Sequence, residues 1–318
     1  MLSNNQGDES LATLVGVVLK VAQMHGSSVA LSDLEQLLPT GTTSKDIADA
    51  FEILPALPGN YALKDGFLVP KASDHLPSND FNLRQRHSIA NIQVARWLSK
   101  AVGNKEALTI AVSGSTSYRA ASPGDDVDLF CVTRPHTMWL FLAKALLLTR
   151  ASRVLWKSRA PICLSCLMDE EYATRLFSKD RGALFARDAL VAEVLFGGEQ
   201  YASLLDSASW MKRYFPRLHD GASTLPGMQP NATAKASSWS RFANFFLFIT
   251  VGSYIRAKAR FHNHILAREG KGLSTFYARV GTDHLMYESA KYVRLKEIYD
   301  DIRPALKDLR KNSSTVKR

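Results

Sequence analysis

Two aspartates, Asp126 and Asp128, lie close together in the otherwise apolar segment DDVDLFCVT at residues 125–133. An ionised carboxylate in an apolar strand is unfavourable unless a partner balances its charge. Because side chains of a strand alternate between two faces, positions 126 and 128 share one face and Asp125 takes the other. Paired carboxylates suit Mg²⁺ or Mn²⁺, hard cations that prefer oxygen ligands. We therefore predict that Asp126 and Asp128 are metal ligands and catalytic residues, and that Asp125 is not a ligand.

The segment just before these aspartates is suited to binding a phosphate. ALTIAVSG, residues 107–114, is an apolar run that ends in Gly114, where the backbone can turn sharply and approach a ligand. Ser115 and the small polar residues after it are expected to open a helix, whose first N–H groups have no intrahelical partner. Arg119 follows Ser115 by one helical turn and is expected to reach a phosphate as well. Gly114, Ser115 and Arg119 are therefore predicted to bind nucleotide.

An apolar strand, Gly-Ser, ten intervening residues and then Asp-x-Asp in a second strand form a restrictive combination. Residues 107–133, which carry it, resemble the nucleotidyltransferase superfamily typified by DNA polymerase beta. The wider layout is similar to that of uncharacterised prokaryotic proteins with nucleotidyltransferase domains. The resemblance implies an α/β (α+β) core with a mixed sheet, in which Gly114 and Ser115 hold phosphate while Asp126 and Asp128 hold the metal ions.

Many members of this superfamily carry a third acid on a later strand, where it helps to activate the attacking hydroxyl. The corresponding strand here, PICLSCLM, has Cys163 and Ser165 where an acid is expected. Asp169 and Glu170 follow the end of this strand. Each is a candidate for the third ligand, and each is equally consistent with a solvated cap residue.

These residues together predict a metal-dependent nucleotidyltransferase, which moves an NMP from an NTP to an acceptor hydroxyl and releases pyrophosphate. Two metal ions about 4 Å apart can bind the attacking and the leaving oxygen of such an in-line displacement. The alternative is a non-catalytic nucleotide-binding or regulatory protein with a degenerate core, which the missing third acid favours. A glycosyltransferase that binds a sugar nucleotide through Asp-Val-Asp is disfavoured by the short spacing from Gly-Ser and by the basic second half.

Charge and patterning divide the chain into three expected parts. Residues 1–78 are an acidic module of three short helices and a hairpin around Asp65-Gly66, which resembles a winged-helix domain. Residues 79–170 are the expected nucleotidyltransferase core. Residues 171–318 are expected to form a basic helical domain, with a loop at 221–237 and a disordered tail.

Apolar periodicity predicts the main elements of the last two parts. Helices are expected at 78–103, 138–148, 182–196, 203–215 and about 238–268, and a further strand at 153–157. FANFFLFITVGSYI, residues 242–255, is too short to span a bilayer and is predicted to be a buried helix. The basic and aromatic residues between Ser253 and Lys271 are typical of either a nucleic-acid backbone site or a solvated helix face.

The net charge of +10 is distributed unevenly. Residues 1–80 hold 4 Lys/Arg and 10 Asp/Glu, so any affinity for polyanions is expected in the later part. The predicted recognition helix, Ser44–Leu54, carries Lys45 against three acids, so DNA binding through the N-terminal module is not expected. Three classes of acceptor for the NMP are consistent with the sequence: RNA, a protein side chain and a small hydroxylated molecule.

Three cysteines, Cys131, Cys163 and Cys166, give no disulfide framework and indicate a reducing, cytoplasmic setting. Cys163 and Cys166 form a single CxxC pair, whereas a structural zinc site takes four ligands, so a buried strand is favoured there. The polar N-terminal residues do not have the order of a signal peptide, and no membrane span is expected.

Overall fold

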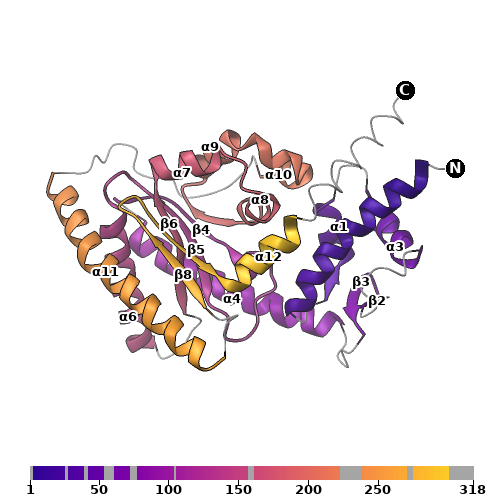
Figure 1. Ribbon diagram of the computed structural model, residues 1–318, viewed down its shortest axis with the longest axis horizontal. Helices are drawn as coiled ribbons and strands as arrows, with labels where there is room; N and C mark the ends of the chain where they lie inside the picture. Colours follow the sequence, from indigo (N-terminus) through magenta and orange to yellow (C-terminus); the bar gives the residue numbers. More distant parts are fainter. Residues whose placement is uncertain are drawn as a thin grey trace.

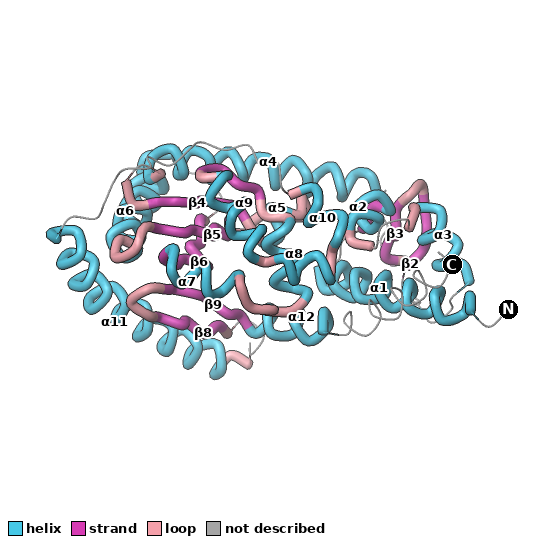
Figure 2. The backbone as a smooth tube through the Cα atoms, turned by 90° about the horizontal axis from the view of Figure 1, so that it is seen from above, coloured by secondary structure: helices cyan, strands magenta, loops and turns pink. Residues whose placement is uncertain are grey.

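A six-stranded sheet in the order β7-β4-β5-β6-β9-β8 lies in the left half of the molecule as drawn in Figures 1 and 2, and the N-terminal elements lie to its right. The computed structural model describes residues 3–25, 28–38, 42–53, 61–71, 77–103, 105–156, 161–222, 238–270 and 275–300. The strands are β4 (Ala107–Val112), β5 (Val127–Thr133), β6 (Ile162–Asp169), β7 (Glu193–Phe196), β8 (Phe276–Val280) and β9 (His284–Ser289). Strands β5 and β6 run parallel, and the other neighbouring pairs are antiparallel. The mixed α/β fold class is therefore confirmed.

The N-terminal module has a small sheet of its own. Its elements in chain order are α1 (Ser3–His25), β1 (Val29–Ala30), α2 (Leu31–Gln36), α3 (Ser44–Ile53), β2 (Tyr61–Lys64) and β3 (Phe67–Pro70). The strands pair in the order β1-β3-β2. The predicted hairpin is present, since β2 and β3 pair around Asp65 and Gly66, whose φ angles of 50° and 77° suit a two-residue hairpin turn.

Helices cover both faces of the six-stranded sheet. One face carries α4 (Pro77–Val102), α6 (Met138–Trp156) and α11 (Ser238–Arg268). The other carries α7 (Glu170–Phe177), α8 (Ala183–Leu190), α9 (Gly198–Ser207), the 3-10 helix η1 (Ser209–Arg213) and α12 (Ala290–Asp300). The buried apolar cluster on this second face continues into α1, α2 and α3, so the N-terminal module shares a core with the sheet.

Arg217 of α10 (Pro216–Gly221) ties the N-terminal module to the second half of the chain. Its guanidinium donates hydrogen bonds of 2.8 Å to the backbone oxygens of Glu35 and Thr42. The Glu35 carboxylate in turn accepts hydrogen bonds from the backbone N–H and the hydroxyl of Ser44, at the start of α3. Because the rigid guanidinium fork fixes the direction of its bonds, these contacts orient the module against α10.

The described part of residues 171–318, which is expected to be a helical domain, is mostly helical but also contains β7, β8 and β9. The helix predicted at 182–196 ends after Leu190, and Glu193–Phe196 pairs with β4 instead. Strand β9 pairs with β6, and β8 pairs with β9 at the edge of the sheet. The edges of β4 and β6 offer backbone hydrogen-bond partners that local periodicity does not reveal. Pairing with these edges makes β7 and β9 strands.

The strand predicted at 153–157 is also wrong. Residues 153–156 form the last turn of α6, and residue 157 lies outside the described residues. The helix that begins at Met138 contains neither glycine nor proline, so nothing in the sequence interrupts it before Trp156. Most of the predicted loop at 221–237, and the whole of the predicted disordered tail, lie outside the described residues.

Residues 242–255 are helical, as predicted, but the prediction that this segment is buried is wrong. Within α11, Phe242, Phe245, Phe246 and Ile249 are exposed by 62, 55, 57 and 49%. The segment is apolar all round, and the packing of α6 and β8 covers only one side of it. Within the part of the chain that the structure describes, no helix is long and apolar enough to cross a membrane.

Gly197, between β7 and α9, should be the most sensitive glycine of the sheet. Its φ is 71°, and a Cβ there would lie 1.7 Å from the carbonyl oxygen of Leu108 in β4. We expect Gly197→Ala to lower the free energy of unfolding by more than about 3 kcal/mol, because backbone strain adds to a clash with a buried strand.

Gly124→Ala is the matched control, since Gly124 also has a positive φ, 90°, but faces open space. It should cost only about 1–2 kcal/mol through backbone strain. Thermal and urea denaturation followed by circular dichroism measures both variants. Equal losses for the two would show that Gly197 does not support the sheet as described.

Candidate metal and nucleotide site

The two predicted metal ligands lie where β5 and β6 begin. Asp126 directly precedes β5 and is exposed, whereas Asp128 is the second residue of the strand and is half-buried. A carboxylate oxygen of each and the Sγ atom of Cys163 all lie within 4.8 Å of one another. This proximity follows from the sheet register, in which Asp128 pairs with Cys163 across the parallel strands. The structure thus brings Asp126 and Asp128 together, with a thiol as the third member of the group.

Gly114 brings the backbone against this carboxylate pair. It begins the short helix α5 (Gly114–Ser117), which directly follows β4, and its φ of 65° favours glycine. A Cβ at this position would lie only 2.7 Å from the Oδ2 atom of Asp128. The ladder between β4 and β5 extends to this point, because the Ser113 N–H donates to the Asp128 carbonyl oxygen at 2.9 Å. The absence of a side chain at Gly114 therefore permits the close approach.

Helix α4 fixes the loop between α5 and β5. The Arg84 guanidinium donates to the Ser122 hydroxyl at 2.8 Å, and the Ser88 hydroxyl accepts a hydrogen bond from the Ala121 N–H at 3.1 Å. The Asn91 side chain donates to a threonine hydroxyl within α5 at 3.3 Å. These polar contacts, which repeat along one side of α4, set the position of the loop relative to the sheet.

The hydroxyl of Ser115 is engaged within the same loop. It donates to the Oδ2 atom of Asp125 at 3.1 Å, and this oxygen also accepts the Ser122 N–H at 2.8 Å. Asp125 therefore closes the loop and does not belong to the candidate ligand group. A phosphate would bind the Ser115 hydroxyl only by exchanging this partner, whereas the backbone N–H groups of the first turn of α5 are placed for it by the helix itself.

Arg119 lies on the β7 side of the Gly114 turn. Its guanidinium forms an ion pair of 2.6 Å with Glu193 of β7, which pairs with β4 on the side away from β5. The other carboxylate oxygen of Glu193 is paired with Arg96 at 3.0 Å. The Nη1 atom of Arg119 is buried without a hydrogen-bond partner, which is an unfavourable state that an incoming oxygen would relieve.

Neither candidate for the third acid lies at the site. Asp169 pairs with Thr133 at the far end of β5, whereas Asp128 pairs with Cys163 at its beginning. The separation along β6 is on the order of 20 Å at the usual rise of a strand. Asp169 caps α7 and accepts the Tyr172 N–H at 2.9 Å, and the Glu170 carboxylate accepts a hydrogen bond from Gln200. Cys163 and Ser165 occupy the site instead.

Asp188 of α8 is an acid near the site that the sequence analysis missed. Its half-buried carboxylate accepts a hydrogen bond from the hydroxyl of Tyr118, which follows α5 and is 70 residues distant in sequence. The Arg187 guanidinium lies 4.0 Å from the centre of the Tyr118 ring, and its Nε atom is buried without a partner. Asp188 sits in the middle of an ordinary amphipathic helix, so no local signal in the sequence marks it.

The site concentrates negative charge in a partly buried place. Burial and then the charge of Asp126 raise the pKa of Asp128 from 3.8 to about 7, and the charge of Asp188 adds to this. Burial raises the pKa of Asp188 itself to about 6. Burial and the two neighbouring carboxylates hold the pKa of the Cys163 thiol well above its usual value. A cation among these groups would relieve the repulsion, and the two carboxylates are ligands that Mg²⁺ and Mn²⁺ prefer.

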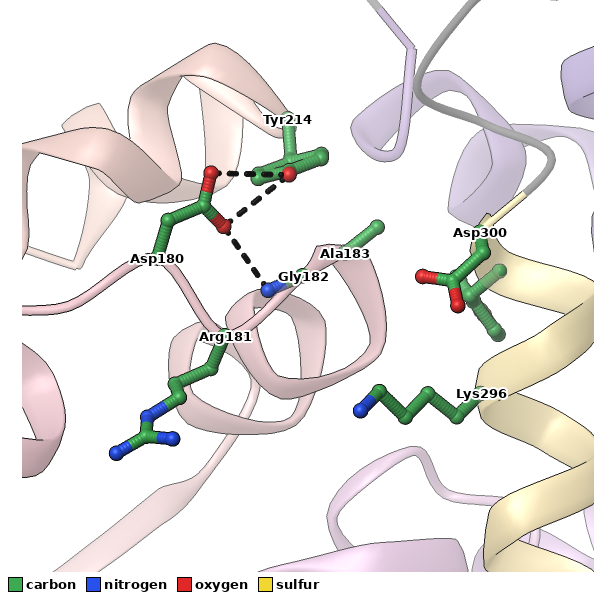
Figure 3. A pocket seen from close by; sticks show the side chains of 8 residues that line it. Asp180, Arg181, Gly182, Ala183, Tyr214, Lys296 and Asp300 are labelled. Atoms are coloured by element: carbon green, nitrogen blue, oxygen red, sulfur yellow. Dashed lines mark hydrogen bonds between the residues drawn. The ribbon is translucent and has the colours of Figure 1, made fainter.

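A separate pocket of about 290 Å³ lies around the start of α8 (Figure 3). The described residues that line it are Asp180, Arg181, Gly182, Ala183, Tyr214, Lys296, Tyr299 and Asp300. The Asp180 carboxylate accepts hydrogen bonds from the Tyr214 hydroxyl at 3.2 and 3.3 Å and from the Gly182 N–H at 2.9 Å. The pocket therefore lies towards the opposite end of α8 from Asp188, and its lining includes none of the predicted site residues.

Comparison with known proteins gives no relative for this chain. No protein-family model matches it, and neither the curated proteins nor the solved structures include a significant match.

The raised pKa of Asp128 leads to a prediction about stability. Because the folded protein holds this proton more tightly than the unfolded chain does, the free energy of unfolding should fall as pH rises from about 4 to about 7. In the absence of divalent metal, Asp128→Asn should be more stable than the wild type at pH 8, by up to about 4 kcal/mol, and this gain should vanish near pH 4.

Urea denaturation at both pH values, with chelator present, measures this difference. The same substitution at Asp206, an exposed acid of α9, serves as the control and should not give a comparable pH-dependent gain. Loss of stability in Asp128→Asn at pH 8 would contradict the electrostatic description of the site.

Proposed function

We propose that this protein is a metal-dependent nucleotidyltransferase, with its site at the start of β5. The observation that supports it most is that the Gly114 backbone lies against the Asp128 carboxylate. The side chains of Asp126 and Cys163 lie close to the same carboxylate. Backbone N–H groups can bind phosphate and carboxylates can bind its metal ion, and a glycine at the turn allows the two to come together.

Each residue has a distinct proposed role. Asp126 and Asp128 would hold Mg²⁺ or Mn²⁺, which when bound neutralises triphosphate charge and positions the reacting oxygens. The backbone of Gly114 and Ser115 would hold the phosphates, and the unpartnered Nη1 of Arg119 would donate a hydrogen bond to a further phosphate oxygen. Catalysis of this kind depends mainly on positioning and charge neutralisation.

The order of elements supports the finer interpretation of the fold. A strand, a Gly-Ser turn with a short helix, and a second strand that bears the acids are the features of the resemblance to the polymerase-beta superfamily. In the N-terminal module, the order α1-β1-α2-α3-β2-β3 with strands paired β1-β3-β2 supports the winged-helix interpretation. Its docking through Arg217 favours an interdomain role over DNA binding.

Transfer of labelled nucleotide tests the proposal. The protein is incubated with each α-labelled NTP, Mg²⁺ or Mn²⁺, and a cell extract that supplies RNA, proteins and small hydroxylated molecules as acceptors. The wild type should label one of these fractions. Asp126→Asn and Asp128→Asn should each reduce labelling by more than about a hundredfold, because the remaining carboxylate binds the metal poorly.

Asp206→Asn is the matched control and should keep full activity. Circular dichroism establishes that the variants are folded. Labelling that persists in the double variant Asp126→Asn/Asp128→Asn would exclude these residues from the reaction.

A second candidate function is nucleotide binding without transfer. Cys163 and Ser165 stand where an acid is expected on β6, and Asp188 lies on a helix rather than on this strand. Cys163→Asp separates the two functions. If the wild type is an enzyme limited by the missing acid, this substitution should raise transfer severalfold at pH 7. If the wild type binds metal and NTP but labels nothing with or without the substitution, it is a binding protein.

The proposal also covers the acceptor molecule and the cellular compartment. The acceptor that we propose is RNA, a protein side chain or a small hydroxylated molecule, each of which offers a hydroxyl to the transferred NMP. The structure records Cys131, Cys163 and Cys166 as free thiols, which is consistent with the reducing cytoplasmic setting that we propose.

A further inference from the structure

Helix α11 carries a continuous exposed stripe along its length of about 45 Å. The positions follow one another at intervals of three or four residues, so they share one face of the helix. They are Trp239, Phe242, Phe246, Ile249, Ser253, Ala257, Arg260, His264 and Arg268, and each is exposed. The first four are large apolar side chains, exposed by 75, 62, 57 and 49%. Exposed apolar surface of this extent marks a site of association.

The opposite side of α11 is firmly fixed to the rest of the molecule. The Asn244 side chain accepts a hydrogen bond of 2.7 Å from the backbone N–H of Trp139, which lies at the start of α6. The Arg256 guanidinium donates to the Val280 carbonyl oxygen of β8 at 2.9 Å. Asn263 bonds both backbone groups of Phe276. Helix α11 lies on the flank of the molecule (Figures 1 and 2), and the stripe is the side of the helix that the rest of the chain leaves exposed.

The charge on α11 has a single sign. From Ser238 to Arg268 the helix contains no acidic residue. Lys258, Arg260 and Arg268 are exposed, and none of them forms an ion pair with a described residue. The apolar half of the stripe is uncharged, and the basic half continues it on the same face. A partner must therefore offer an apolar surface and an anionic one side by side.

We propose that α11 binds an anionic lipid surface, with the helix lying in the plane of the interface. Trp239, Phe242 and Phe246 would enter the boundary between headgroups and acyl chains, where aromatic side chains are favoured. Arg260 and Arg268 would contact anionic headgroups, each adding to the attraction. This activity is separate from the proposed nucleotide site, because α11 packs on the other face of the sheet.

Charge complementarity favours a lipid surface over the other occupants. A second copy packed along the stripe in parallel would bring arginines against arginines. An antiparallel copy would place arginines over phenylalanine rings, where a cation–π contact supplies only a weak attraction and no anion neutralises the charge. An RNA strand would find phosphate partners only in the basic half, because no cation lies between Phe242 and Ile249. An anionic lipid interface satisfies both halves together.

Sedimentation with vesicles tests the proposal. The full chain is mixed with vesicles of phosphatidylcholine alone, or of phosphatidylcholine with phosphatidylglycerol, at low and high salt. It should sediment with the anionic vesicles and much less with the neutral ones, and high salt should weaken binding. Phe242→Ser/Phe246→Ser and Arg260→Gln/Arg268→Gln should each weaken binding by at least about tenfold.

Leu83→Ser/Ile89→Ser is the matched control, because these side chains of α4 are exposed by 49 and 46% and lie outside the stripe. It should bind as the wild type does. Blue-shifted tryptophan emission on vesicle binding should diminish in Trp239→Phe. Circular dichroism and denaturation check that every variant is folded.

Several results would overturn the proposal. They are the absence of binding to anionic vesicles, an equal loss in the α4 control, and a dimer that the phenylalanine substitutions abolish while no vesicle binding occurs. Retention by immobilised RNA without vesicle binding would assign the stripe to nucleic acid instead. Vesicle binding should be unchanged in Asp126→Asn/Asp128→Asn, so the outcome does not depend on the nucleotide site.

Discussion

The close approach of the Gly114 backbone to the Asp128 carboxylate is the constraint on which the site depends. It requires the antiparallel pairing of β4 with β5, a left-handed backbone conformation at the turn and the absence of a side chain at residue 114. The polar contacts from α4 then hold the loop so that Asp126 and Asp128 remain together at its end. Larger elements of the fold thus position a single contact, in which the Gly114 turn meets a pair of carboxylates.

That contact gathers negative charge where water is partly excluded, and the neighbouring elements determine how it is balanced. Cys163 holds its proton because burial and both carboxylates disfavour the thiolate. Asp188 comes from α8, which packs on the same face of the sheet. Its carboxylate accepts a hydrogen bond from Tyr118, over whose ring the neighbouring Arg187 guanidinium lies. Without a bound cation, the raised pKa of Asp128 lets this carboxyl group retain its proton up to about pH 7. Charge relief by a metal triphosphate is therefore the property that links the geometry to the proposed function.

The parts that could be predicted from the sequence are those that local pattern determines. Gly114, Asp126 and Asp128 are marked by an apolar run, a tight turn and alternating acids, and α11 is marked by helical periodicity. Strand β7 could not be found in this way, since its pairing depends on the free edge of β4 rather than on its own residues. Asp188 reaches the site only through the tertiary packing of α8. The outer face of α11 is equally hidden, because a helix that is apolar all round gives no sign of which side its neighbours leave open.

Metal binding in the presence of nucleotide tests the central claim most directly, because both the catalytic and the non-catalytic interpretation require it. Mn²⁺ is titrated into the wild type and into Asp126→Asn/Asp128→Asn with a non-hydrolysable ATP analogue, and free Mn²⁺ is followed by electron paramagnetic resonance. After subtraction of the Mn²⁺ that the analogue binds without protein, the wild type should bind Mn²⁺ more tightly with the analogue than without it, and the double variant should lose this binding. Identical titration curves for the two proteins would contradict the assignment of a metal and nucleotide site to these carboxylates.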